Sequence, residues 1–167
     1  MIEITGRRVL LRAFRPDEFE ALYEAHAASD SIVGTVDCDR IRRRVEQSGT
    51  WVDGRLDLAV ESGGALVGSA DVRSGRMMLP GGVCEFGIEL WAARRGAGIG
   101  TDAVTALTGW LHEHGFPRVQ AGTAVRNAPM RRVLEKCGYA HEGTMRAFIA
   151  EGGTRADYAL YAHVALA

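Results

Sequence analysis

Hydrophobic and polar residues alternate along several short stretches of the chain, which is the pattern of half-buried β-strands. Glycine-containing segments separate several of these stretches, as expected for turns. The predicted strands cover residues 7–14, 56–62, 65–73, 83–91, 118–125, 139–147 and 156–164. The chain is therefore expected to build a sheet of about seven strands.

Apolar residues spaced by three and four predict helices between some of these strands. The clearest helix covers residues 98–114, where Ile99, Ala103, Leu107 and Leu111 share one face. Gly115 is placed to end it. A shorter helix begins near Asn127 and ends at Gly138, with Met130, Val133, Leu134 and Cys137 on its apolar face.

Two further helices are predicted in the N-terminal third. Asp17 is expected to cap the first, because Glu20 stands three residues later in capping-box spacing. Phe19, Leu22, Tyr23 and His26 then lie on one face of that helix. The second covers about residues 39–48, and its arginines (Arg40, Arg42, Arg43 and Arg44) indicate a solvated face. The whole pattern predicts a single α/β (α+β) domain over residues 1–167.

Composition excludes several classes of protein. The formal net charge of −1 over 167 residues gives no sign of a nucleic-acid partner. No apolar run approaches the roughly 20 residues that span a bilayer, so we expect no membrane association and a cytoplasmic location. Cys38, Cys84 and Cys137 are scattered without a CxxC spacing, which argues against a disulfide framework and against a metal site.

The segment with the clearest chemical meaning joins the strand at 83–91 to the helix at 98–114. It contains Arg94 and Arg95, followed by glycines at 96, 98 and 100. Glycines allow a backbone to approach a ligand closely, and the first turn of a helix presents unpaired N–H groups to an anion. A pyrophosphate is the natural occupant of such a turn.

Other glycine-rich turns fit this segment less well. The dinucleotide-binding fingerprint requires glycine where this chain has Thr101, and the strand at 118–125 contains no carboxylate to bind a ribose. A P-loop requires Gly-Lys-Ser/Thr, and no lysine lies near. A plain turn with glycines used only for packing remains the simplest alternative.

The run Arg95-Gly96-Ala97-Gly98-Ile99-Gly100-Thr101 resembles the acyl-CoA-binding motif of the GNAT N-acetyltransferase superfamily. Residues 127–139, from Asn127 to Gly138-Tyr139, resemble its second signature. Leu11-Arg12 followed by Arg15-Pro16-Asp17 resembles the opening of the ribosomal-protein-alanine N-acetyltransferase-like branch. The resemblance implies a mixed, mostly antiparallel sheet flanked by helices, with one splayed parallel strand pair.

The same resemblance implies acetyl-CoA as the co-substrate, held between the strands at 83–91 and 118–125, with no metal. Backbone groups from Leu90 to Ala92 would bind the pantetheine arm, the glycine loop would bind the pyrophosphate, and Asn127 would either contact the ligand or cap its helix. The expected coenzyme-binding residues are Leu90, Trp91, Ala92, Arg94, Arg95, Gly96, Ala97, Gly98, Ile99, Gly100, Thr101, Asn127 and Met130.

The expected reaction is attack of a primary amine on the thioester, which requires a base because such amines are protonated near neutrality. Glu85 is the first candidate, since the family commonly has glutamate there, and Glu89 is the second; strand alternation puts both on one face. The branch usually has serine at the position of Met130, which cannot donate a proton. Water or Tyr139 would then protonate the thiolate, although Tyr139 also suits core packing.

The acceptor stays open at this point: a protein N-terminus or a small-molecule amine, including an amino antibiotic. His141, Arg146, Asp157 and Tyr158 lie on the tail strands that border the acceptor groove in the family, without assigned roles. Homodimers are common in the branch. Because Met130 replaces the serine, an acyl-CoA-binding regulator with little turnover is the alternative function.

Overall fold

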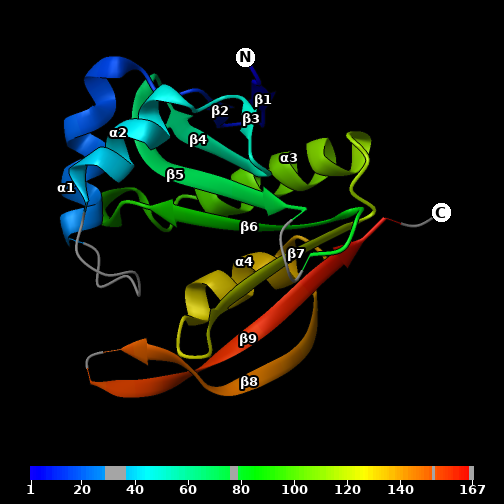
Figure 1. Ribbon diagram of the computed structural model, residues 1–167. Coiled ribbons are helices and arrows are strands. Elements are labelled where there is room, and N and C mark those ends of the chain that lie inside the picture. The colour runs from blue at the N-terminus through cyan, green and yellow to red at the C-terminus, as the bar shows by residue number, and fades with distance from the viewer. Residues whose placement is uncertain (29–36, 76–78, 152, 166–167) are drawn as a thin grey trace.

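A nine-stranded sheet with helices on both faces forms the framework of the protein in the computed structural model (Figure 1). The structure describes residues 1–28, 37–75, 79–151 and 153–165. Within them the elements are β1 (Ile4–Thr5), β2 (Leu10–Arg12), a 3-10 turn (Pro16–Glu18), α1 (Phe19–Ala28), α2 (Cys38–Glu46), β3 (Trp51–Val52), β4 (Arg55–Ser62), β5 (Ala65–Ser74), β6 (Val83–Leu90), a 3-10 turn (Ala92–Arg94), α3 (Ile99–Glu113), β7 (Arg118–Ala124), α4 (Ala128–Lys136), β8 (Ala140–Glu151) and β9 (Thr154–Val164).

The strands follow the order β1-β2-β4-β5-β6-β7-β9-β8, with β3 paired to β4. Every pairing is antiparallel except that of β6 with β7, which is parallel. The predicted mixed, mostly antiparallel α/β architecture with one parallel pair is thus confirmed. Nine strands replace the expected seven because β1 and β3 have two residues each, too few to produce an alternation pattern.

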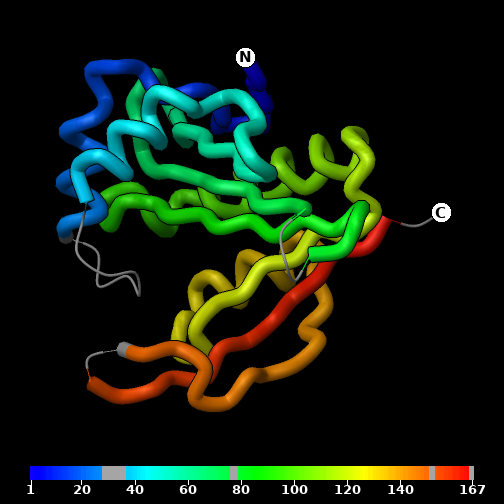
Figure 2. Tube along the Cα trace, viewed as in Figure 1, coloured from blue at the N-terminus to red at the C-terminus, as the bar shows by residue number. Residues whose placement is uncertain are grey.

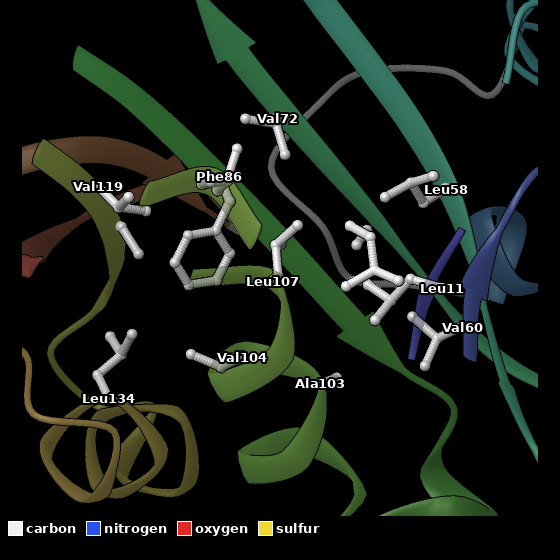
Figure 3. Packing of buried hydrophobic residues seen from close by; sticks show 14 of the residues in the cluster. Leu11, Leu58, Val60, Val72, Phe86, Ala103, Val104, Leu107, Val119 and Leu134 are labelled. Carbon is white, nitrogen blue, oxygen red and sulfur yellow. The ribbon is translucent and has the colours of Figure 1, made fainter. Parts of the chain in front are cut away.

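Packing of α3 against the sheet produces the main core (Figure 3). Leu107 on α3 and Leu58, Val72 and Phe86 on the strands are at most 2% exposed. The other face carries a smaller cluster in which Leu22 of α1 and Ile41 of α2 cover the sheet. The tube view shows the two N-terminal helices on one side of the sheet and α3 on the other (Figure 2).

The start of the first helical segment differs from the prediction. Pro16 opens a 3-10 turn, and the Glu18 carboxylate accepts a hydrogen bond from the backbone N–H of Arg15 at 2.8 Å. Asp17 is therefore not the cap. Glu18 is also paired with Arg12 at 2.6 Å, and both side chains are nearly buried. This ion pair joins residues six positions apart, a spacing that is not part of the helical pattern, and it helps to fix where the segment begins.

Candidate active site

The parallel strands β6 and β7 separate after a short paired stretch. Their register runs from Val83–Arg118 to Glu85–Gln120 and ends there, although β6 continues to Leu90 and β7 to Ala124. Figure 1 shows the two strands diverging beyond this point. A splayed parallel pair, as expected from the sequence, therefore stands in the middle of the sheet.

The backbone N–H and C=O groups of alternate residues of β6 point toward this opening. Its register with β5 is continuous from Ser74–Cys84 to Gly68–Leu90, and the Trp91 N–H donates to the Val67 carbonyl at 3.0 Å. Because bonded pairs alternate along an antiparallel ladder, the backbone groups of Leu90 point away from β5, toward β7. Of the stretch expected to bind pantetheine, Leu90 is thus oriented suitably, whereas the Trp91 N–H is already used and Ala92 begins a 3-10 turn.

The glycine loop follows directly and opens α3. Residues 92–98 are exposed, and Gly96 and Gly98 have φ of 84° and 78°, a left-handed conformation that residues with a Cβ rarely adopt. The first helical bond runs from the Asp102 N–H to the Gly98 carbonyl at 3.1 Å. The N–H groups of residues 99–101 precede it and have no intrahelical acceptor. They form a partial positive charge suited to an anion.

Gly100 lies in the first turn of α3, near β6 and α4. A Cβ at this position would lie 3.4 Å from Leu90 Cδ1 and 3.7 Å from Val133 Cγ2, which are ordinary van der Waals distances. Packing therefore does not require glycine here, and Gly100 is not among the glycines with positive φ. Close approach of a ligand to this glycine stays a prediction.

Arginines reach the loop from two directions. Arg95 folds back so that its Nε donates to the Leu90 carbonyl at 2.8 Å. Arg8, in the turn between β1 and β2, donates from Nη1 to the Ala97 carbonyl at 3.0 Å. Asp102 holds that turn in place by accepting the Arg8 N–H at 2.6 Å. Sequence reasoning missed Arg8, because nothing local links residue 8 to residues 97 and 102.

Asn127 forms the cap of α4. Its Oδ1 accepts from the Met130 N–H at 3.3 Å, and its Nδ2 donates to Thr123 Oγ1 at 3.1 Å. The capping role considered from the sequence is therefore present, and contact with a ligand stays a prediction. Met130 packs partly against the core.

Glu85 and Glu89 lie on the same face of β6, as strand alternation predicts, but their surroundings differ. Glu85 Oε1 pairs with Arg73 Nη2 at 3.1 Å, and its Oε2 accepts from Gln120 Nε2 at 3.1 Å. Both of its oxygens are engaged, and it stands where the strand pair is still closed. Glu89 lies at the open end, with its Oε2 3.8 Å from His26 Nδ1.

His26, in the last turn of α1, presents a defined nitrogen to Glu89. Arg44 Nη1 contacts His26 Nε2, and because arginine can only donate, Nε2 accepts and the proton resides on Nδ1. Burial and the charge of Arg44 lower the pKa of His26, against a smaller opposing effect of Glu89. A neutral imidazole thus directs an N–H toward Glu89. The sequence identified His26 only as part of a helix face.

Arg44 is not on a solvated face, so that prediction was wrong for this residue. Its Nε pairs with Asp57 Oδ1 at 2.8 Å, and the two side chains are 10% and 8% exposed. Burial opposes ionisation of Asp57, but hydrogen bonding from Arg55 and the charge of Arg44 outweigh it and lower the pKa of this carboxyl. The pair anchors the guanidinium that holds His26.

Tyr139 lies in the main core, 4% exposed, with its ring against Phe86. Its hydroxyl shares a 2.6 Å hydrogen bond with Thr108 Oγ1 on α3. Burial raises the pKa of Tyr139 well above its ordinary value, despite that bond. This packing corresponds to the alternative role considered from the sequence, and a role in proton transfer gains no support from it.

No group of three or more His, Cys, Asp or Glu side chains among the described residues is arranged to hold a metal ion. No helix in the same part of the chain has the length and apolar character needed to cross a bilayer.

Comparison with known structures identifies the same architecture elsewhere. A GNAT-family acetyltransferase from Bacillus anthracis is 24% identical, with 98% of each chain covered and a TM-score of 0.80. RimJ of Mycobacterium smegmatis, determined in complex with CoA-disulfide, is 20% identical over 98% of this chain and 88% of its own, with a TM-score of 0.80. The ribosomal-protein-S5-alanine acetyltransferase of Vibrio fischeri is 15% identical over 98% and 97%, with a TM-score of 0.79. At this identity the likeness concerns the fold.

No curated protein matches the sequence significantly. The family model of the acetyltransferase (GNAT) domain, however, matches residues 8–140, which include the strand pair, the glycine loop and α4. The chain therefore belongs to the GNAT acetyltransferase family.

Proposed function

We propose that this protein transfers the acetyl group of acetyl-CoA to a primary amine, either a protein N-terminus or a small molecule. The observation that carries the proposal is the separation of β6 from β7 directly beside the glycine loop. Backbone groups of Leu90 face that opening, and the unpaired N–H groups of residues 99–101 stand at its end. The RimJ structure, which holds CoA-disulfide, supports the choice of coenzyme. The S5-alanine enzyme supports an amine acceptor.

In this proposal different groups of the chain bind different parts of the coenzyme. The N–H groups from Gly96 to Thr101 bind the pyrophosphate, since the Arg95 N–H already donates to the Ala92 carbonyl. Positive charge is added by Arg94, Arg95 and Arg8. The pantetheine arm lies along Leu90, opposite Asn127 and Met130 at the start of α4. The Trp91 N–H is bonded to Val67, and the carbonyls of Trp91 and Ala92 accept from the N–H groups of Arg94 and Arg95. We therefore expect Trp91 and Ala92 to contact the coenzyme mainly through their side chains.

Glu89 is the base in this scheme, ahead of Glu85. Its carboxylate stands at the open end of the strand pair, whereas both oxygens of Glu85 are already bonded to Arg73 and Gln120. Glu89 removes a proton from the ammonium, and the amine nitrogen then bonds to the thioester carbon. The Leu90 N–H is placed to stabilise the resulting oxyanion. When the C–S bond breaks, a water molecule passes the excess proton of the attacking nitrogen to the thiolate, since Met130 has no proton to give.

A pair of matched variants tests the base. Glu89→Gln should lower kcat/KM at neutral pH by roughly 10²–10⁴-fold, and the loss should shrink at high pH, where the amine deprotonates without help. Glu85→Gln is the control and should lose less. CoA release from acetyl-CoA, followed with a thiol reagent across pH 6–10, measures both. Equal activity of Glu89→Gln and the parent at every pH would reject the assignment, and a larger loss in Glu85→Gln would reverse it.

Met130 favours a second candidate, an acyl-CoA-binding regulator with little turnover, because the branch usually has serine at this position. Calorimetry with acetyl-CoA and thiol release over a panel of peptide, metabolite and aminoglycoside amines distinguish the two. Tight binding without CoA release from any amine would favour the regulator. No heat with acetyl-CoA, together with an Arg95→Glu variant identical to the parent, would reject both.

A further inference from the structure

The backbone of β8 is distorted at Ala147. This residue has φ of 50°, in the left-handed region that residues with a Cβ avoid. The pairing of β8 with β9 shifts register between Met145 and Ile149, so the distortion is a β-bulge. Such a conformation persists where the surroundings determine it.

Two side chains of β9 hold the bulge in place. Asp157 Oδ1 accepts from the Ala147 N–H at 2.8 Å. Arg155 donates from Nε to the Ala147 carbonyl at 2.5 Å and from Nη2 to the Phe148 carbonyl at 3.0 Å. Three hydrogen bonds therefore fix the backbone of Ala147 and Phe148. Bulges of this kind redirect a side chain.

The side chain that follows the bulge is Phe148, which is 53% exposed. Apart from Met1 and Val164, it is the large hydrophobic side chain that the described part of the chain leaves exposed. Its ring lies 5.7 Å from the ring of Tyr158 on β9, tilted by 34°. The two rings form an aromatic pair, and Phe148 is its exposed member among the residues that the structure describes.

Tyr158 connects this aromatic pair to the candidate active site. Its ring lies against β7 at Gly122, where a Cβ would come within 2.1 Å of Tyr158 Cε1. Strand alternation puts Gly122 on the same face as Gln120, which is bonded to Glu85. Burial and the nearby charge of Glu85 raise the pKa of Tyr158. The aromatic pair thus lies on the face of Glu85 and Glu89, along the β7 side of the opening.

Resting on the proposed function, we propose that Phe148 and Tyr158 bind the apolar substituent of the amine acceptor. The substrate class is a primary amine with an apolar or aromatic group beside the reacting nitrogen, such as a peptide N-terminus with an apolar first residue. The carboxylates of the site attract the ammonium group, and the exposed ring gains buried area only when an apolar group covers it. The bulge at Ala147 keeps that ring in position.

The test uses four acceptors of increasing apolar size: glycinamide, alaninamide, leucinamide and phenylalaninamide. The parent should prefer the last two. Phe148→Ala should lower kcat/KM for leucinamide and phenylalaninamide by roughly 10–100-fold, mainly through KM, and leave glycinamide unchanged. Phe148→Tyr should keep the preference, and Arg155→Ala should lose part of it as the bulge relaxes. Val164→Ala is the matched control: Val164 is also an exposed apolar residue, but it lies at the end of β9. This variant should behave like the parent.

Two results would overturn the proposal: an equal loss for all four acceptors in Phe148→Ala, or no loss for any. A preference for amines with a cationic substituent would also overturn it. If the parent binds acetyl-CoA but releases no CoA with any amine, the proposed function fails separately. The subsite is then tested by calorimetry of phenylalaninamide against glycinamide on the acetyl-CoA complex, where Phe148→Ala must abolish the difference.

Discussion

The two faces of the central sheet carry different kinds of side chain. On the side of α3 the strands carry Leu58, Val72 and Phe86, which are at most 2% exposed. Leu107 of α3 packs in the same core (Figure 3). Toward α1 and α2 the apolar cluster is small. Much of that face is a series of ion pairs that runs across neighbouring strands: Arg44–Asp57, Arg55–Asp57, Arg55–Asp71, Arg73–Asp71 and Arg73–Glu85.

The difference suggests that one face stabilises the fold and the other positions side chains of the candidate site. Apolar burial stabilises a fold in proportion to area and does not depend on direction. A buried ion pair adds little net stability, because desolvation offsets attraction, but it fixes the positions of its partners. The series of pairs ends at Glu85, and through Arg44 it also reaches His26 and Glu89. We infer that the α3 face holds the sheet together and the charged face holds the candidate catalytic groups.

Removing a side chain from the α3 face should have the largest effect on stability. Leu107→Ala leaves a cavity in a fully buried position, and we expect a loss of about 2–5 kcal/mol in the free energy of unfolding. Urea denaturation measures it, with Val164→Ala, at a position 55% exposed, as the control. Where both variants are folded, the Kd for acetyl-CoA should match the parent. A loss below that of the control would contradict the division between the faces.

A change on the charged face should affect stability less and turnover more. Asp57→Asn keeps the size of the side chain but removes the charge between Arg44 and Arg55, and we expect a loss of about 1–3 kcal/mol. Because Arg44 then holds His26 less firmly, kcat should fall further than in Leu107→Ala. Denaturation and thiol-release assays on the two variants give the comparison. If kcat follows stability equally in both, the charged face has no special role in positioning.

The smallest effect concerns a polar contact within the α3 side. His112 on α3 donates from Nδ1 to the Phe116 carbonyl at 2.8 Å, so its Nε2 accepts from His163 Nδ1, also at 2.8 Å. Burial lowers the pKa of His163 in the folded protein, and so does repulsion from His112 whenever that residue is protonated. In the unfolded chain this histidine titrates near its ordinary value of about 6.5. The unfolded state therefore binds the proton first as the pH falls.

Stability contributed by neutral His163 is complete above that unfolded pKa and is lost as the pH falls from about 6.5 toward the lower folded value. His163→Gln removes this titration, so its unfolding free energy should decline less steeply than the parent's between pH 7 and 5. Thermal melts over that range provide the measurement. Parallel curves would mean that the histidine pair does not affect acid stability.

Much of the fold was predictable from local patterns. Residues 98–114 were predicted as a helix and α3 covers Ile99–Glu113, because apolar residues repeat at helical spacing through this segment. The strand predicted at 83–91 is β6, and its alternation correctly put Glu85 and Glu89 on one face. The predicted cap of the first helix was wrong. Asp17 does not cap it; Glu18 instead accepts from the Arg15 N–H and pairs with Arg12.

The candidate site was predictable only in part. The residues of the glycine loop are adjacent in the sequence, so the sequence alone identifies the loop. Along the chain, His26 lies 63 residues from Glu89, Arg8 lies 89 residues from Ala97, and Tyr158 lies 36 residues from Gly122. No periodicity links such positions. Arg44 was misjudged because it belongs to an arginine-rich helix, and only the fold places Asp57 against it.

By itself the sequence determined most of the elements, the glycine-rich turn before α3 and the resemblance to the family, because these depend on periodicity and on residues adjacent in the chain. Only the tertiary structure decided which carboxylate lies at the open end, which histidine faces it, and where the exposed ring of Phe148 lies relative to β7. Those relations depend on which strands and helices become neighbours, because no local spacing in the sequence pairs these groups.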